Sequence, residues 1–240
     1  MCMKQVLALI LLSWTLTASA FWQGLTAKSW LVADETGKVI QGENTHEVRS
    51  IASISKLMTV MVVLDAKQDL DQYIKPYTRR ELIQLALVKS DNTAAQILCD
   101  NYPSGKHSCV TAMNHKAQEL GMLNTRFIEP TGLSVFNVST AEELIKLVLK
   151  AEEYPEIVSA SKTSEVKIKL RNKWLVFRNT NPIIGKKHNF IVSKTGYINN
   201  SGGCIVMMLD TDIGRRIVVV LGSKSTRTRI PEAEFIAENY

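Results

Sequence analysis

Apolar and polar positions indicate strands at the start of the chain, followed by a long helix. Residues 28–33 alternate, residues 34–37 (Asp-Glu-Thr-Gly) contain a turn glycine, and residues 38–41 continue as a second strand. This pattern predicts a β-hairpin. Next, Ile54–Ala66 is strongly apolar and free of Gly and Pro. The stretch is too long for a strand and predicts a buried helix with Ser53 at its start.

The central part of the chain has the spacing of helices, and the C-terminal part has that of strands. This order predicts an α+β fold, in which the terminal strands join one antiparallel sheet of about five strands covered by helices, with a helical lobe. Helices are expected at Arg79–Leu87, from Asp91–Thr93 to Leu98, at Cys109–Leu120, at Glu142–Lys150 and from Pro231 onward. Strands are expected at Val166–Leu170, Trp174–Phe177, Phe190–Lys194, Cys204–Leu209 and Arg216–Leu221.

Composition narrows the class of protein. A chain of 240 residues with 45% hydrophobic and 22% charged residues fits one large domain. No GxGxxG follows a predicted strand, which argues against a dinucleotide-binding fold. The net charge of +6 is modest, and Lys and Arg are scattered along the sequence. This charge is compatible with work near an acidic polymer or anionic surface, but a solvated, slightly basic face explains it more simply, and we expect no nucleic-acid partner.

The N-terminus resembles a secretory signal. Lys4 precedes a mostly apolar run, Val6–Leu16, and Ala18-Ser19-Ala20 has the small-x-small pattern of a cleavage site. We expect residues 1–20 to be a signal peptide, residues 21–240 to be the functional domain, and the formal charge to fall to +5 with the loss of Lys4. The alternative is that this same apolar run is a membrane anchor that is never removed. No later stretch approaches the length of a transmembrane helix.

The cysteines and histidines give no metal signature. Cys99 and Cys109 flank a Pro-Ser-Gly turn, whereas Cys204 stands alone. A Cys99–Cys109 disulfide and three buried free thiols are both open. Zinc is disfavoured because neither Cys-x-x-Cys nor paired-histidine spacing occurs. The histidines lack motif context and are expected to be surface or structural residues: His46, His107, His115 and His188.

Three short motifs stand in order along the chain: Ser53-Ile54-Ser55-Lys56, Ser90-Asp91-Asn92 and Lys194-Thr195-Gly196. Each is weak alone, and Ser-x-x-Lys recurs at residues 159–162 and 164–167, in a polar segment that leads into a strand. Only Ser53 begins a long apolar helix and precedes the other two motifs. Their order and context therefore favour a common site.

Elementary chemistry explains the motif context. Positions i and i+3 share a helix face, so Lys56 can present its amine to the Ser53 hydroxyl. The helix N-terminus favours developing negative charge. Lysine becomes a base when burial and a neighbouring cation, here Lys194, lower its pKa. Ser90 can relay a proton and the Asn92 amide can hold a carbonyl, while Gly196 lets substrate backbone approach the strand.

The three motifs resemble the signature of penicillin-binding proteins and serine β-lactamases. Residues 50–59, 124–134 and 177–181 extend the similarity to the low-molecular-mass D-Ala-D-Ala peptidases, and most closely to DD-endopeptidases of the penicillin-binding protein 7 type. The resemblance covers nearly all of the chain after the signal. It implies a β-lactamase/transpeptidase-like fold and a periplasmic enzyme, soluble or loosely membrane-associated, that is a monomer without metal or organic cofactor. The implied partners are peptidoglycan stem peptides, with β-lactams as covalent inhibitors.

The resemblance also implies roles for single residues. Ser53 would attack the carbonyl of the penultimate D-alanine to give an acyl-enzyme, with Lys56 as general base and Ser90 passing the proton to the leaving amine. The backbone N–H groups of Ser53 and Tyr197 would form the oxyanion hole. Lys194 and Thr195 would bind the carboxylate of the leaving residue. Water would then release the acyl group, whereas a β-lactam would be trapped at this step.

Two departures from the family stand out. The interval between the Ser53 helix and Ser90 is short, with only a brief polar link at Lys67–Tyr77, which leaves one wall of the cleft undefined. Because the chain ends soon after its last predicted helix, we also expect it to be without the extra β-domain and amphipathic anchor of the larger carboxypeptidases.

Several alternatives to a DD-endopeptidase remain open from sequence. A carboxypeptidase breaks the same bond, and a non-catalytic wall-binding module would keep the fold. A serine β-lactamase needs a deacylating base, but no Glu-x-x-Leu-Asn follows Ser90, and Glu129 in a Pro-Thr-Gly loop is the nearest candidate. No Gly-x-Ser-x-Gly elbow supports a Ser-His-Asp hydrolase.

Overall fold

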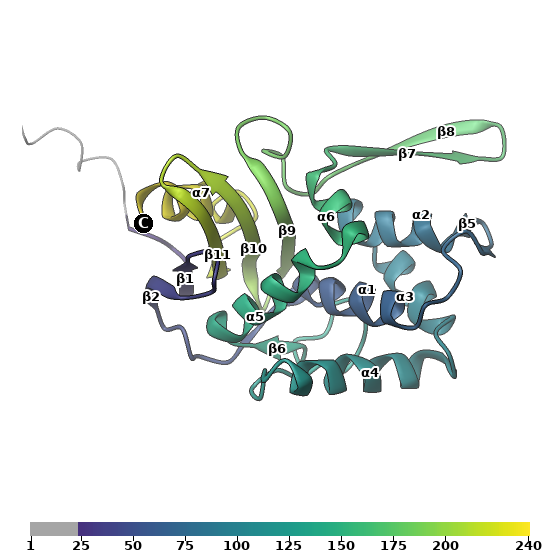
Figure 1. Cartoon of the computed structure of the whole chain (residues 1–240), viewed down its shortest axis with the longest axis horizontal. Helices are drawn as coiled ribbons and strands as arrows, with labels where there is room; N and C mark the ends of the chain where they lie inside the picture. Colours follow the sequence, from purple (N-terminus) through teal and green to yellow (C-terminus); the bar gives the residue numbers. More distant parts are fainter. Residues whose placement is uncertain (1–23) are drawn as a thin grey trace, which may run out of the picture.

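The computed structural model describes residues 24–240, and it confirms the α+β class and the five-stranded antiparallel sheet. The proposed signal peptide and its cleavage site lie outside these residues. The sheet has the order β2-β1-β11-β10-β9, in which the N-terminal hairpin pairs with the C-terminal strands (Figure 1). Its strands are β1 Ser29–Ala33, β2 Val39–Glu43, β9 Asn189–Ile198, β10 Gly202–Thr211 and β11 Gly214–Ser223.

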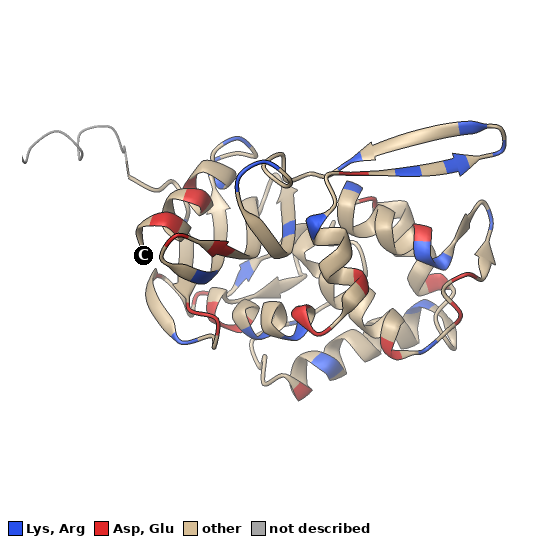
Figure 2. Cartoon of the chain, turned by 45° about the horizontal axis from the view of Figure 1, so that its top comes forward, with Lys and Arg blue, Asp and Glu red and all other residues tan. Residues whose placement is uncertain are grey.

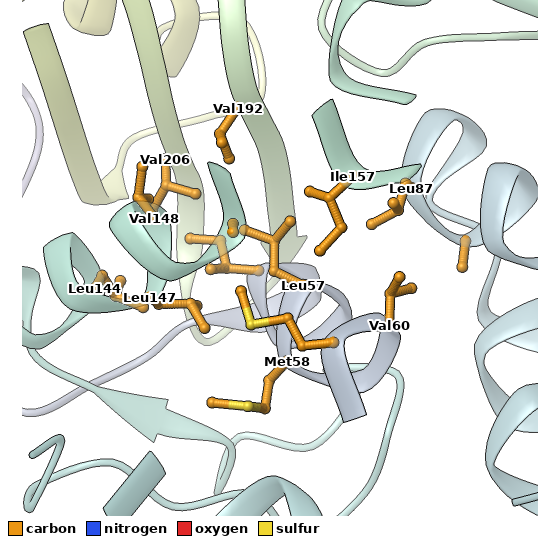
Figure 3. Packing of buried hydrophobic residues seen from close by; sticks show 14 of the residues in the cluster. Leu57, Met58, Val60, Leu87, Leu144, Leu147, Val148, Ile157, Val192 and Val206 are labelled. Carbon is orange, nitrogen blue, oxygen red and sulfur yellow. The ribbon is translucent and has the colours of Figure 1, made fainter. Parts of the chain in front are cut away.

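Helices cover both faces of this sheet, because side chains alternate along each buried strand. On β10, Ile205 and Met207 belong to the core under the C-terminal helix α7 (Arg229–Asn239), whereas Val206 belongs to the larger core on the other face. That larger core joins the sheet to the central helix α1 (Ser55–Asp65) and to helices α5 (Ala141–Glu152) and α6 (Pro155–Lys162), as Figure 3 shows. The apolar stretch of α1 is thus enclosed on all sides.

A helical lobe lies beside the sheet and surrounds α1 (Figure 1). The predicted helix at residues 79–87 is α2 (Arg79–Gln84) followed by a π-helical turn, Leu85–Lys89. Thr78 starts α2 with a capping box to Glu81. The remaining elements of the lobe and its base are α3 Asn92–Asp100, α4 Gly105–Glu119, and the two-stranded pair β3 Arg49–Ser50 and β6 Val138–Ser139.

The structure corrects two sequence expectations in residues 155–178. The polar segment in which no helix was predicted forms helix α6, with Pro155 at its first turn and Ile157 buried. The strands β7 (Glu165–Leu170) and β8 (Lys173–Arg178) pair only with each other and do not join the main sheet. Val166 and Ile168 are buried on one face of this hairpin, and the opposite face is exposed, with basic residues along both strands (Figure 2).

The interval between α1 and the second motif also contains a small hairpin. The sequence indicated only a polar link there, but β4 (Tyr73–Ile74) pairs with β5 (Tyr77–Thr78). Ile74 and Tyr77 pack against the main core. This wall of the lobe is therefore ordered by apolar contacts despite its short length.

Of the two cysteine alternatives, the structure has the disulfide. Cys99 at the end of α3 is bonded to Cys109 in α4, and Cys204 is a buried free thiol. No helix among residues 24–240 is long and apolar enough to cross a membrane.

Replacing both bonded cysteines by alanine should lower the free energy of unfolding by about 2–3 kcal/mol, because the bond closes a short loop in the unfolded chain. Urea denaturation of Cys99→Ala/Cys109→Ala and parent protein would measure the difference. Thiol titration of unfolded, unreduced protein made from residue 21 should find Cys204 alone. Three reactive thiols before reduction would contradict the disulfide.

Candidate active site

Ser53 lies where the chain turns sharply into α1. The sequence predicted that the helix starts at Ser53, but a 3-10 turn (Ala52–Ile54) precedes α1, which begins at Ser55. Ala52 has a φ of 47°, an unusual value for a non-glycine residue. Two glycines make room for this turn. A Cβ on Gly132 would lie 2.0 Å from the Ala52 carbonyl oxygen, and one on Gly196 would lie 3.0 Å from the Ser53 nitrogen.

Lys56 is fully buried and its amine contacts Ser53 directly. The Nζ atom donates to Ser53 Oγ at 2.9 Å and to Asn92 Oδ1 at 2.7 Å, and it also donates to the Thr131 carbonyl oxygen. Burial lowers the pKa of Lys56 to about 8, although the negative charges of Glu129 and Asp91 oppose the shift. At this pKa a minor fraction of Lys56, about a tenth at pH 7, is neutral and able to accept a proton, far more than of an ordinary lysine.

A second lysine–serine pair lies beside the first. Lys194 Nζ donates to Ser90 Oγ at 2.8 Å and to the Thr195 carbonyl oxygen at 2.9 Å. The pKa of Lys194 is lowered well below its ordinary value, first by burial and then by repulsion from Lys56 and Arg229. Ser90 adopts a left-handed conformation (φ 58°) directly after the π-helical turn. Both features are frequent at functional sites.

The third motif lies on β9, at one edge of the main sheet, next to the turn that carries Ser53. Thr195 Oγ1 lies 2.6 Å from Thr180 Oγ1. Gly196 has its carbonyl oxygen bound by Arg229 Nη1 at 2.6 Å, and Tyr197 is half-exposed at the end of the buried run of β9. The structure thus brings the three motifs to one place between the sheet edge and the helical lobe.

Sequence reasoning missed several residues that hold this arrangement. The Thr131 carbonyl oxygen accepts from Lys56, and Asn137 Nδ2 donates to Ser55 Oγ and to the Glu129 carbonyl oxygen.

Arg229, which is 7% exposed, reaches Gly196 from α7. No spacing in the sequence could indicate Arg229. Thr131 lies in a segment that carries the family resemblance, but its backbone role has no side-chain signature.

Glu129 is engaged in holding its own loop. Its carboxylate accepts from the backbone N–H groups of Thr131 and Gly132 at 2.7 and 2.6 Å, and from Thr131 Oγ1. A carboxylate with these partners fixes the turn that contributes the Thr131 carbonyl. The bonds argue against Glu129 as a base that activates water.

The geometry suits acyl transfer. Ser53 has an amine as its proton acceptor, which is activated by burial, and a second hydroxyl and a second amine lie next to it. The direction of the Ser53–Lys56 bond reverses when Lys56 is neutral, so that Oγ–H donates to Nζ.

Comparisons with known proteins agree with this chemistry. Residues 16–75 and 72–225 match the peptidase S11 family, described as D-alanyl-D-alanine carboxypeptidase. A D-alanyl-D-alanine endopeptidase of Pseudomonas aeruginosa is 41% identical over 88% of this chain and 76% of its own length. One from Escherichia coli is 42% identical over 76% of this chain and 67% of its own length. A D-alanyl-D-alanine carboxypeptidase of Bacillus subtilis is 26% identical over 83% of this chain and 58% of its own.

Solved structures share the fold. The Streptomyces K15 DD-transpeptidase is 25% identical with a TM-score of 0.82, and the alignment covers 89% of this chain and 96% of that one. Penicillin-binding protein D2 of Listeria monocytogenes, in its cefotaxime-bound form, is 26% identical with a TM-score of 0.77 over the same shares. The chain therefore belongs to the D-alanyl-D-alanine carboxypeptidase family, peptidase S11, and is a serine-type D-Ala-D-Ala peptidase.

Proposed function

We propose that this chain is a DD-endopeptidase that cleaves D-alanyl cross-links of peptidoglycan through an acyl-enzyme on Ser53. The observation that carries the proposal is the distance of 2.9 Å between the buried Lys56 amine and Ser53 Oγ. This pair lies next to β9, the edge strand that carries the third motif. The endopeptidase preference rests on the relatives, because those at 41% and 42% identity bear that name and the Bacillus carboxypeptidase is only 26% identical.

Acylation would replace the C–N bond of the substrate by an ester bond to Ser53 Oγ and would move the serine proton to the leaving amine. Lys56 Nζ takes the proton of Ser53 Oγ, which attacks the carbonyl carbon of the penultimate D-alanine. The oxyanion is held by the backbone N–H groups of Ser53 and Tyr197. As the tetrahedral intermediate collapses, the C–N bond breaks and the leaving amine receives a proton through Ser90. Water then cleaves the ester and restores Ser53.

The remaining residues of the motifs would position the substrate. The Asn92 amide has its oxygen on Lys56, so its NH₂ is the end that can donate to a substrate carbonyl. Lys194 and Thr195 would attract the carboxylate of the leaving residue. Glycine at position 196 lets the edge strand lie against the turn that carries Ser53, because a Cβ there would press on the Ile51 carbonyl oxygen and the Ser53 nitrogen.

A β-lactam would enter the same first step and remain on Ser53. Its ester would persist because Glu129, the nearest candidate for a deacylating base, is held by the backbone of its own loop. We further propose that residues 1–20 export the chain to the periplasm, where both peptidoglycan and β-lactams are met.

Cross-linked muropeptides test the function. Incubation of purified dimeric muropeptides with the enzyme should convert them to monomers, as measured by liquid chromatography and mass spectrometry. Loss of a single alanine from a pentapeptide, with dimers left intact, would instead indicate a carboxypeptidase. If neither product forms, the chain is a non-catalytic module.

Benzylpenicillin should acylate Ser53 and remain bound. Intact-mass measurement should find one adduct per chain, with peptide mapping placing it on Ser53, and Ser53→Ala should show none. The matched control is Ser159→Ala, which alters a second Ser-x-x-Lys sequence that lies in α6. Rapid drug turnover without a lasting adduct would favour a β-lactamase.

The rate of acylation should rise with pH up to about 8. Below the pKa of Lys56, which is about 8, the amine is protonated and cannot accept the Ser53 proton. The second-order acylation constant should therefore fall about tenfold per pH unit below that value and level off above it. Stopped-flow measurements with a chromogenic β-lactam between about pH 6 and pH 9 would test this. A flat profile over this range would contradict Lys56 as the base.

A further inference from the structure

A second cluster of ionisable side chains lies far from Ser53, where the loop before β9 meets α7. His188 directly precedes β9, and Glu234 and Glu238 are one turn apart on α7. One ligand atom from each of the three residues lies within 4.8 Å of the others. Lys194 lies six positions after His188 along β9, which corresponds to about 20 Å along an extended strand.

The imidazole of His188 is the unusual member of this cluster. Its side chain is only 8% exposed, and its Nε2 lies 3.4 Å from Glu234 Oε1 and 3.2 Å from Glu238 Oε1. Although these are ion-pair distances, the buried Nε2 forms no hydrogen bond with either carboxylate. The ring is fixed on its other side by an edge contact with Phe190. A buried nitrogen that faces two carboxylates without a hydrogen bond is the arrangement that a shared cation would satisfy.

The spacing of these atoms fits zinc. Zinc binds histidine nitrogen and carboxylate oxygen at about 2.0–2.2 Å in tetrahedral geometry, which places neighbouring ligand atoms about 3.3–3.6 Å apart. The two nitrogen–oxygen distances around His188 are 3.4 and 3.2 Å.

Lys187 now occupies the position of a competing cation. Its Nζ contacts Glu238 Oε1 and lies 3.5 Å from Glu234 Oε1. The Lys187 side chain is 57% exposed, so it can rotate into solvent when another cation enters. Its presence shows that the two carboxylates already attract positive charge.

We propose that His188, Glu234 and Glu238 form a zinc site, with a water as fourth ligand. The ion would tie α7 to the start of β9, the strand that carries Lys194, Thr195 and Gly196. The role is structural, because the site is about 20 Å from the reacting atoms, and it does not depend on the proposed endopeptidase activity. Sequence spacing argued against zinc, because His188 and Glu234 are far apart in the chain and only the fold brings them together.

Isothermal titration of untagged, chelator-treated protein with zinc chloride tests the site. One ion per chain with a Kd below about 10 µM is expected, together with a rise in Tm that EDTA reverses. His188→Gln and Glu238→Gln should each weaken binding at least tenfold. Lys187→Ala should tighten it, since the competing ammonium is removed.

The matched control is another histidine–carboxylate pair, His115 and Glu119, whose atoms lie 3.1 Å apart on α4. His115→Gln/Glu119→Gln should leave zinc affinity unchanged. Circular dichroism spectra of all variants should match that of the parent protein, which shows that each variant is folded whether or not the chain cleaves muropeptides. Binding weaker than about 10 µM or below one equivalent would overturn the proposal, as would unchanged affinity in both His188→Gln and Glu238→Gln.

Discussion

The burial of two lysine amines side by side is the constraint on which the rest of the site depends. Lys56 and Lys194 are both withdrawn from water, and the repulsion between them adds to the cost of charge on Lys194. An amine in this position must lose its proton readily or be surrounded by acceptors. The site does both: the pKa values are lowered, and each amine has oxygen partners.

The oxygen partners of the two amines come from segments that are distant in sequence. Packing between the sheet and the helices holds these segments together. Lys56 stands on the central helix, whose enclosure by the sheet and the helical lobe fixes its position. Lys194 stands on the edge strand, and Arg229 on the helix of the opposite layer holds the carbonyl oxygen of Gly196, two residues further along that strand. The strained backbone at Ala52 and Ser90 persists because this packing determines it from several sides.

Much of the fold follows from periodicity, and the exceptions have local causes. The N-terminal hairpin, the central helix and the three C-terminal strands of the sheet were predicted at nearly their observed positions. The hairpin β7–β8 has a strand pattern but no place in the sheet, because pairing partners are not encoded in alternation. Helix α6 was missed because its Ser, Lys and Glu residues obscure a short apolar face.

For the site, the sequence by itself determined which side chains are the candidates for the chemistry. Motif order singles out Ser53, Lys56, Ser90, Asn92 and Lys194, because the proposed acyl transfer requires those functional groups wherever the chain places them. Only the tertiary structure decided the protonation behaviour of these side chains and the hydrogen bonds that hold them in place. The depressed pKa of Lys56, the Thr131 carbonyl and the reach of Arg229 to Gly196 depend on burial and on contacts between distant segments. Desolvation and hydrogen-bond direction are properties of the folded surroundings, and no local residue pattern specifies them.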